Sequence, residues 1–201
     1  MAKKQFKVCK TVELKDIQAD VKIHGVKGKD VIVVEYDSLS NGLSVFEEKD
    51  VLIVEQRDEK VPEIVIKVPV GTDIIAKGLM GKIFSTSWTG GKVDISAIGD
   101  SDVFVEDAKE LSVAAIGNLD LQVGKFNGKM SLGLQGSFMV YMPMKESFID
   151  DLTVMANGHG EIEIYSKIKD AQIFTFGADV ILHSVEAIVK QRVKRGALIT
   201  E

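Results

Sequence analysis

The sequence predicts an all-β fold, a parallel β-solenoid of about five to six coils of about 19 residues that follows a set of N-terminal flanking strands. Three observations predict it. Alternating segments rich in β-branched residues run through the chain, as at 31–36 and 63–70. Glycines recur at nearly constant spacing in the second half. Helical periodicity is absent except for a short candidate in residues 185–196.

The repeat emerges when the second half of the chain is aligned on Gly99, Gly117, Gly136 and Gly158, which are spaced by 18, 19 and 22 residues. The positions two, four and six residues before each glycine are apolar in all four copies, as are those four and six residues after it. A fifth copy follows 19 residues later but slips register after its glycine, and an earlier glycine starts the series. The predicted corner glycines are Gly78, Gly99, Gly117, Gly136, Gly158 and Gly177.

A period of this length with two alternating strands has a physical meaning. One such unit cannot bury its inward face alone, whereas stacked units bury a continuous column of apolar side chains. Each glycine has the parity of the inward positions, so we expect it at the corner where two strands meet. There the backbones approach closely and a residue without Cβ tolerates the bend. The glycines are therefore interpreted as structural, and no P-loop spacing accompanies them.

Residues 1–70 alternate without clean repeats and are expected to form strands that start or flank the solenoid. Asn41 and Gly42 predict a hairpin turn within this part. Pro69 lacks a backbone donor and Gly71 permits a turn, so strand pairing should break there.

The solenoid itself is expected over residues 71–185, and residues 186–201 should cap its last coil within the same structural domain. This C-terminal segment carries a small basic cluster, which is interpreted as a solvated cap rather than a nucleic-acid site. The cluster consists of Lys190, Arg192, Lys194 and Arg195.

The two outer faces of the predicted solenoid differ. Outward positions after each glycine are mostly acidic or polar, whereas those before it form a partly apolar face that includes Ile98, Ile116, Met155, Phe174 and Phe176. An apolar face left open to water marks an interface. We therefore expect this face to be covered, either by the N-terminal segment or by a second subunit in a homo-oligomer.

The composition excludes several functions. A net charge of −5 and a pI near 5.3 argue against nucleic acid or an anionic membrane as partner. No apolar run reaches the roughly 18 residues that a membrane span needs, and no signal peptide is recognisable, so the chain as written predicts a cytoplasmic protein. The single cysteine, Cys9, is expected to be a small buried residue.

The sequence predicts no catalytic residues and no cofactor. Asp100 and Asp102 are the only calcium candidates, and a solvated edge that opposes strand pairing is the favoured interpretation. Three histidines, His24, His159 and His183, lie in different parts of the repeat without metal-ligand spacing.

A carbohydrate-binding or carbohydrate-active β-helix protein is the alternative function. The pair Asp150 and Asp151 is suggestive, but it falls in the insertion between two coils. A glycosidase requires two carboxylates held across the sugar. Trp88 could stack on a sugar, although an aromatic packed in its loop is the more common case.

The order of these segments resembles bacterial putative adhesin families of unknown function, including the auto-transporter adhesin head, or GIN, domains. Those families place an I-x-V-P-x-G-T stretch before glycine-punctuated repeats, and Ile66, Val68, Pro69, Gly71 and Thr72 match it. The resemblance covers most of residues 10–185 and implies a single-stranded right-handed parallel β-helix with a cell-envelope association. The expected function is a non-enzymatic, adhesin-like scaffold for binding or assembly.

Overall fold

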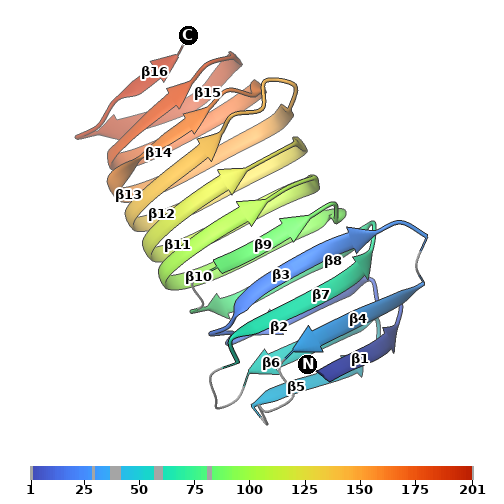
Figure 1. Ribbon diagram of the computed structural model, residues 1–201. Helices are drawn as coiled ribbons and strands as arrows, with labels where there is room; N and C mark the ends of the chain where they lie inside the picture. Colours follow the sequence, from blue (N-terminus) through green and yellow to red (C-terminus); the bar gives the residue numbers. More distant parts are fainter. Residues whose placement is uncertain (1, 29, 37–41, 57–60, 81–82, 201) are drawn as a thin grey trace.

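The computed structural model describes residues 2–28, 30–36, 42–56, 61–80 and 83–200 (Figure 1). These residues form sixteen β-strands that belong to one hydrogen-bonded sheet, and no helix occurs among them. The sheet coils into a solenoid of about seven turns, which confirms the predicted fold class and exceeds the predicted coil number slightly.

Five long strands make the regular part of the solenoid. They are β10 (Gly90–Val105), β11 (Ala108–Val123), β12 (Phe126–Met142), β13 (Phe148–Ile164) and β14 (Lys167–Leu182). Neighbours pair in parallel, and Gly99, Gly117, Gly136 and Gly158 are aligned across the ladder as the repeat predicts. Opposite Gly177 the pairing is interrupted by a bulge, which confirms the predicted slip of the fifth copy.

Each long strand has two halves that lie on opposite faces of the flattened coil. The half of β10 before Gly99 pairs with β8 (Thr72–Leu79), and the half after it pairs with β9 (Ile83–Ser87). At the other end, β15 (Val185–Lys194) and β16 (Leu198–Thr200) pair with the two halves of β14. The C-terminal segment thus adds a turn, and the helix expected at 185–196 is wrong because these residues complete the sheet.

The N-terminal strands are stacked out of sequence order. The strand β2 (Thr11–Lys15) lies between β8 and β6 (Val51–Gln56), and β3 (Asp20–Val26) lies between β9 and β7 (Glu63–Pro69). The first coil of the chain is therefore enclosed by coils that follow it in the sequence, as Figure 1 shows.

Antiparallel strands close the N-terminal end. They are β1 (Ala2–Lys7) and β4 (Val31–Tyr36) on one face and β5 (Leu43–Glu48) on the other. The predicted turn falls partly outside the described residues, because Asn41 belongs to the segment 37–41. The strands on either side of it do not pair with each other, so the predicted hairpin is wrong. The hairpin instead joins β5 to β6 through Lys49 and Asp50.

The core is a column of apolar side chains along the solenoid axis. One row runs through Ile95, Val113, Leu132, Val154 and Ile173, which are aligned in successive coils and almost completely buried. Burial of such a side chain contributes about 1.5–3 kcal/mol. Cys9 is buried in the same core as predicted, and burial raises the pKa of its thiol.

The corner glycines are required for a reason that differs in part from the predicted one. Gly117, Gly136, Gly158 and Gly177 have positive φ and are only partly buried, and a Cβ at each would overlap the carbonyl oxygen of the glycine in the preceding coil. A side chain at these positions is thus excluded by the backbone of the neighbouring coil rather than by the packed interior. Gly78 is not part of this ladder, because it lies at a register shift of β8 beside Asp16.

A carboxylate ties the N-terminal edge strand to the sheet. The carboxylate of Glu35 in β4 forms ion pairs with Lys3 of β1 at 3.1 Å and with Lys67 of β7 at 3.2 Å. Hydrogen bonds from Lys3 and then Lys67 hold the pKa of Glu35 below its ordinary value of 4.5. The ionised form is therefore favoured by the folded state.

We expect Gly136→Ala to destabilise the protein more than Gly99→Ala. Both positions have positive φ, which costs a residue with a side chain about 1–3 kcal/mol. A Cβ at Gly136 would also overlap the backbone of the glycine in the preceding coil, whereas a Cβ at Gly99 would contact nothing within 4 Å. Urea unfolding of the two variants measures the difference, and equal losses would contradict the stacking explanation.

We expect Glu35→Gln to lower stability at pH 7, and the difference from the wild type to vanish in acid. Because the folded-state pKa of Glu35 is lowered, its contribution is present above pH 4.5 and is lost as the pH falls through the folded-state value. Thermal unfolding between pH 7 and pH 3 tests this. The control is Glu161→Gln, because Glu161 makes no ion pair among the described residues; a constant difference at all pH values would refute the linkage.

Candidate binding surface

Outward side chains form straight columns because the coils are in register. The face built from the first halves of β10 to β14 carries two such columns, which we call the apolar stripe. One column is Ser96, Ala114, Gly133, Met155 and Phe174, and the other is Ile98, Ile116, Gln135, Asn157 and Phe176.

The apolar stripe is open to solvent in the single chain. The exposed fractions of Ile98, Ile116, Met155 and Phe176 are 52%, 57%, 56% and 42%. The prediction that the N-terminal segment covers this face is wrong, because those strands extend the solenoid along its axis instead (Figure 1). Coverage by a second subunit stays a prediction.

The stripe is hollowed at its centre. A shallow groove of about 580 Å³ runs along it, lined by side chains of both columns. Small residues form its floor at Ser96, Ala114 and Gly133, and the larger Met155 and Phe174 rise at one end. The surface is therefore not a flat sheet face but a concave one with a raised end.

Basic side chains border the raised end. Arg192 and Lys194 of β15 continue the two columns beyond Phe174 and Phe176. The guanidinium of Arg195 lies over the Phe176 ring, 5.0 Å from its centroid, where a cation interacts favourably with the aromatic face. Most side chains of β15 are exposed.

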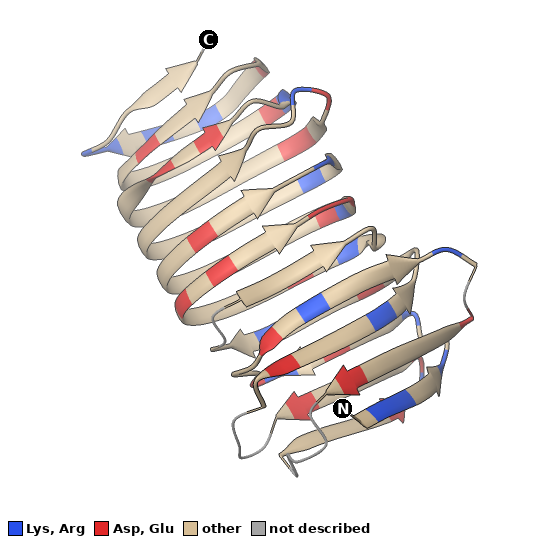
Figure 2. Cartoon of the chain, viewed as in Figure 1, with Lys and Arg blue, Asp and Glu red and all other residues tan. Residues whose placement is uncertain are grey.

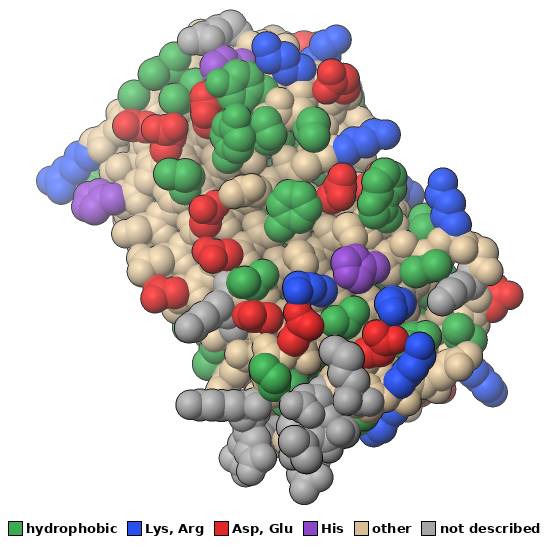
Figure 3. Space-filling view, in the orientation of Figure 1, with side chains coloured by type: hydrophobic (Ala, Val, Ile, Leu, Met, Phe, Trp, Pro, Cys, Tyr) green, Lys and Arg blue, Asp and Glu red, His purple; other side chains and the backbone are tan. Residues whose placement is uncertain are grey.

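The opposite face carries one acidic column and one mixed column that includes the exposed Phe104 and Tyr141. Asp102, Asp120, Glu161 and Asp179 follow one column of the second strand halves, with Met139 between them. Figure 2 shows acidic positions on successive strands of this face, and Figure 3 shows apolar side chains beside them, several of which lie together near the C-terminal end. Like charges at this spacing repel, so the acidic column favours solvent over an apolar partner.

The calcium candidates lie on the face that carries the acidic column. Asp100 accepts a hydrogen bond of 2.7 Å from the Asn118 side chain in the next coil. Among the residues that the structure describes, no group of three or more His, Cys, Asp or Glu is arranged to hold a metal ion. Calcium binding by Asp100 and Asp102 stays a prediction.

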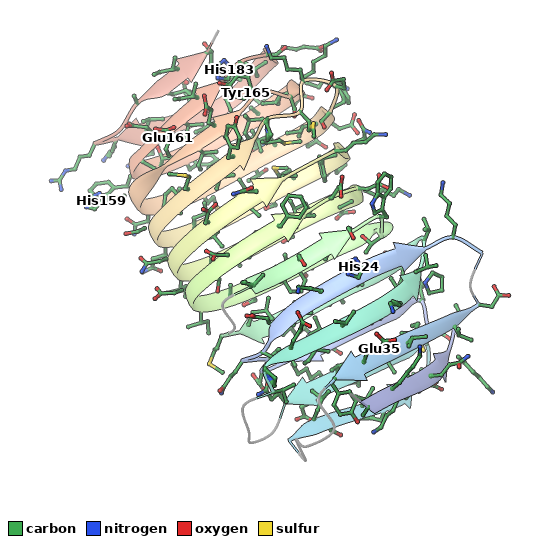
Figure 4. All side chains as sticks on the ribbon, viewed as in Figure 1. His24, Glu35, His159, Glu161, Tyr165 and His183 are labelled. Atoms are coloured by element: carbon green, nitrogen blue, oxygen red, sulfur yellow. The ribbon has the colours of Figure 1, made fainter. Side chains whose placement is uncertain are left out.

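The three histidines lie far apart on the molecule, as Figure 4 shows. His24 contacts Ser87 through Nδ1 at 2.8 Å, and His159 is exposed beside Ser137 of the preceding coil. His183 stacks on Tyr165 at 3.8 Å, and its Nε2 lies 3.2 Å from Glu163 Oε1. Sequence patterns did not indicate this last cluster, because its members come from different coils and meet only at a corner.

The carboxylates and the tryptophan of the alternative function are placed differently from the prediction. Asp150 and Asp151 lie within β13 rather than in the insertion, and Asp151 pairs with Lys129 at 2.7 Å. Trp88 is not packed in its loop, because 56% of it is exposed after the end of β9.

The fold and its surfaces define a parallel β-solenoid with an apolar stripe on one outer face and an acidic column on the opposite face. The fold is similar to that of a putative adhesin from Parabacteroides merdae, with a TM-score of 0.50 and 13% identity over 100% of this chain and 95% of that one. The family resemblance predicted from the sequence is thus confirmed at the level of the fold.

Two further solved structures are similar with lower scores. A putative adhesin from Parabacteroides distasonis has a TM-score of 0.46 and 12% identity over 100% of this chain and 96% of that one. A putative cell adhesion protein from Clostridium sporogenes has a TM-score of 0.34 and 11% identity over 99% and 98% of the two chains. No family model and no curated protein matches the sequence significantly.

Among the described residues, no helix is long and apolar enough to cross a membrane.

Proposed function

We propose that the chain is a non-enzymatic, adhesin-like scaffold at the cell envelope that associates with protein through the apolar stripe. The exposure of Ile98, Ile116 and Met155 in one continuous surface is the observation that carries this proposal. Contiguous apolar surface of this kind marks an interaction site in soluble proteins. The similar fold of proteins whose names include the word adhesin supports the same function.

The shape of the stripe favours a protein surface over a small molecule. Its groove is shallow and open along its length, whereas small-molecule sites enclose most of the ligand. Each exposed aliphatic side chain that becomes buried in a complex contributes about 1.5–3 kcal/mol before the cost of association. A few such anchors across several coils are enough for a specific interface.

We expect Met155→Asp to abolish association and Met139→Asp to leave it unchanged. The two methionines are exposed by 56% and 58% but lie on opposite faces, so they form a matched pair. Beads coated with each variant are tested on surfaces coated with collagen, fibronectin, mucin or the chain itself. Wild-type beads should bind at least one surface, and the substitution in the stripe should reduce that binding at least tenfold.

Two results would contradict the proposal. Wild-type beads that bind none of the four surfaces would remove its basis. Equal binding by the Met155→Asp and Met139→Asp variants would show that association does not use the stripe. Circular dichroism of both variants checks that an outward charge has left the β-structure intact.

Carbohydrate binding is the second candidate function, and the exposed indole of Trp88 favours it. Trp88 is the single tryptophan of the chain, so its fluorescence reports on its surroundings directly. If it stacks on sugar, titration with soluble oligosaccharides such as oligogalacturonides should shift or quench the emission. An unchanged spectrum at millimolar oligosaccharide would remove this candidate.

A further inference from the structure

Gly133 is a glycine that the single chain does not explain. Its φ lies outside the left-handed region, and a Cβ built on it would meet only the Val113 carbonyl oxygen, at the ordinary contact distance of 3.9 Å. Every other glycine in the described strands has a positive φ or would bring its Cβ against backbone atoms. Glycine weakens a strand, and the close approach of a ligand or of another backbone is one reason for a strand to retain it.

The surroundings of Gly133 are graded in size along the solenoid axis. On one side the column continues through Ala114 to Ser96, and on the other through Met155 to Phe174. Small side chains therefore occupy one half of the column, large ones occupy the other, and the glycine lies at the midpoint. Such a surface is complementary to a copy of itself turned end for end.

We propose that the partner of the stripe is a second copy of this chain, an inference that rests on the proposed role of the stripe in association. The two copies are related by a two-fold axis that runs along the strand direction at Gly133. The axis places β10 opposite β14 and β11 opposite β13 of the second copy. Ser96 then faces Phe174, Ala114 faces Met155, and Gly133 faces its own equivalent. A two-fold dimer of this kind uses the same patch on both subunits.

The second column is consistent with the same axis. Ile98 faces Phe176 of the second copy, which gives a second apolar pair at each end of the interface. Gln135 faces its own equivalent, and two side-chain amides can donate and accept reciprocally. The strands of the two copies lie nearly aligned, as in packed sheets.

The rim carries charges of both signs. Lys92 of one copy, which already pairs with Glu110 of its own chain, faces Asp170 of the other copy. Glu110 and Asp151 face each other, and each is already paired within its own chain, with Lys92 at 2.6 Å and Lys129 at 2.7 Å. Lys129 faces its own equivalent on the axis, and its charge is compensated by Asp151 of its own chain.

The available area is adequate for a dimer. The five turns from β10 to β14, at about 4.8 Å each, and outer strands of about eight residues at 3.3 Å each span a face of roughly 24 by 26 Å. The resulting face of about 630 Å² per partner, or about 1,260 Å² in total, lies at the low end of the roughly 1,200–2,000 Å² that stable interfaces bury.

Sedimentation equilibrium of Gly133→Arg tests the proposal, with Ser137→Arg as the matched control on the opposite face of the same strand. A side chain fits at position 133 in the monomer, so the variant should fold like the wild type. The wild type and Ser137→Arg should be dimers at micromolar concentration, and Gly133→Arg should be a monomer. A monomeric wild type at 100 µM, or a dimeric Gly133→Arg, would overturn the proposal.

Cross-linking tests the direction of the two-fold axis. Ala114→Cys and Met155→Cys chains should give a heterodimer with a short bismaleimide only when they are mixed, and Gly133→Cys should cross-link with itself. Cys9 contributes little background because it is only 4% exposed. Efficient cross-linking of Ala114→Cys with itself would show a different arrangement and overturn the proposed axis.

The dimer and the proposed function can fail separately. A monomeric wild type whose beads bind a matrix protein, with that binding lost in Met155→Asp, would overturn the dimer and leave the function intact. A dimer disrupted by Gly133→Arg, combined with bead binding that Met155→Asp does not affect, would confirm the dimer and contradict the proposed role of the stripe in adhesion.

Discussion

Direct stacking of backbone on backbone at the bend of each coil is the constraint on which the rest of this structure depends. Successive coils are separated by the strand spacing of about 4.8 Å, and the bend has positive φ, so a Cβ at Gly136 or Gly158 would overlap the coil beneath. Glycine at this position lets each coil follow the path of the preceding one, and the register of the whole ladder is fixed as a consequence.

A fixed register places equivalent positions of every coil in straight columns, and both the core and the surfaces follow from this. Inward columns such as the one through Leu132 form a continuous apolar interior. The residue types in the outward columns can differ between the two faces, because the fold requires only that outward positions alternate with buried ones. The apolar stripe and the acidic column are thus two independent features of one scaffold, and the stripe is the surface that we propose binds a partner.

The ends of the solenoid are protected in different ways. At the N-terminus, antiparallel strands and the ion pairs of Glu35 cover the parallel coils, and the first coil is enclosed by later ones. At the C-terminus, the exposed strand β15 carries Lys190, Arg192 and Lys194. Charged side chains on an edge strand oppose pairing with another chain. These features disfavour growth along the solenoid axis, which is compatible with the proposed association through a lateral face.

The sequence by itself determined the coil period, the inward columns and the existence of a partly apolar outer face, because alternation and glycine spacing are local patterns. Only the tertiary structure decided the stacking of β2 and β3 between later coils, the partners of β5, and the strand at 185–196, since these depend on pairings between distant segments. The meeting of His183 with Tyr165 was hidden for the same reason. The sequence contains Gly133 at an outward position, but only the structure shows that no neighbouring atom of the chain requires a glycine there.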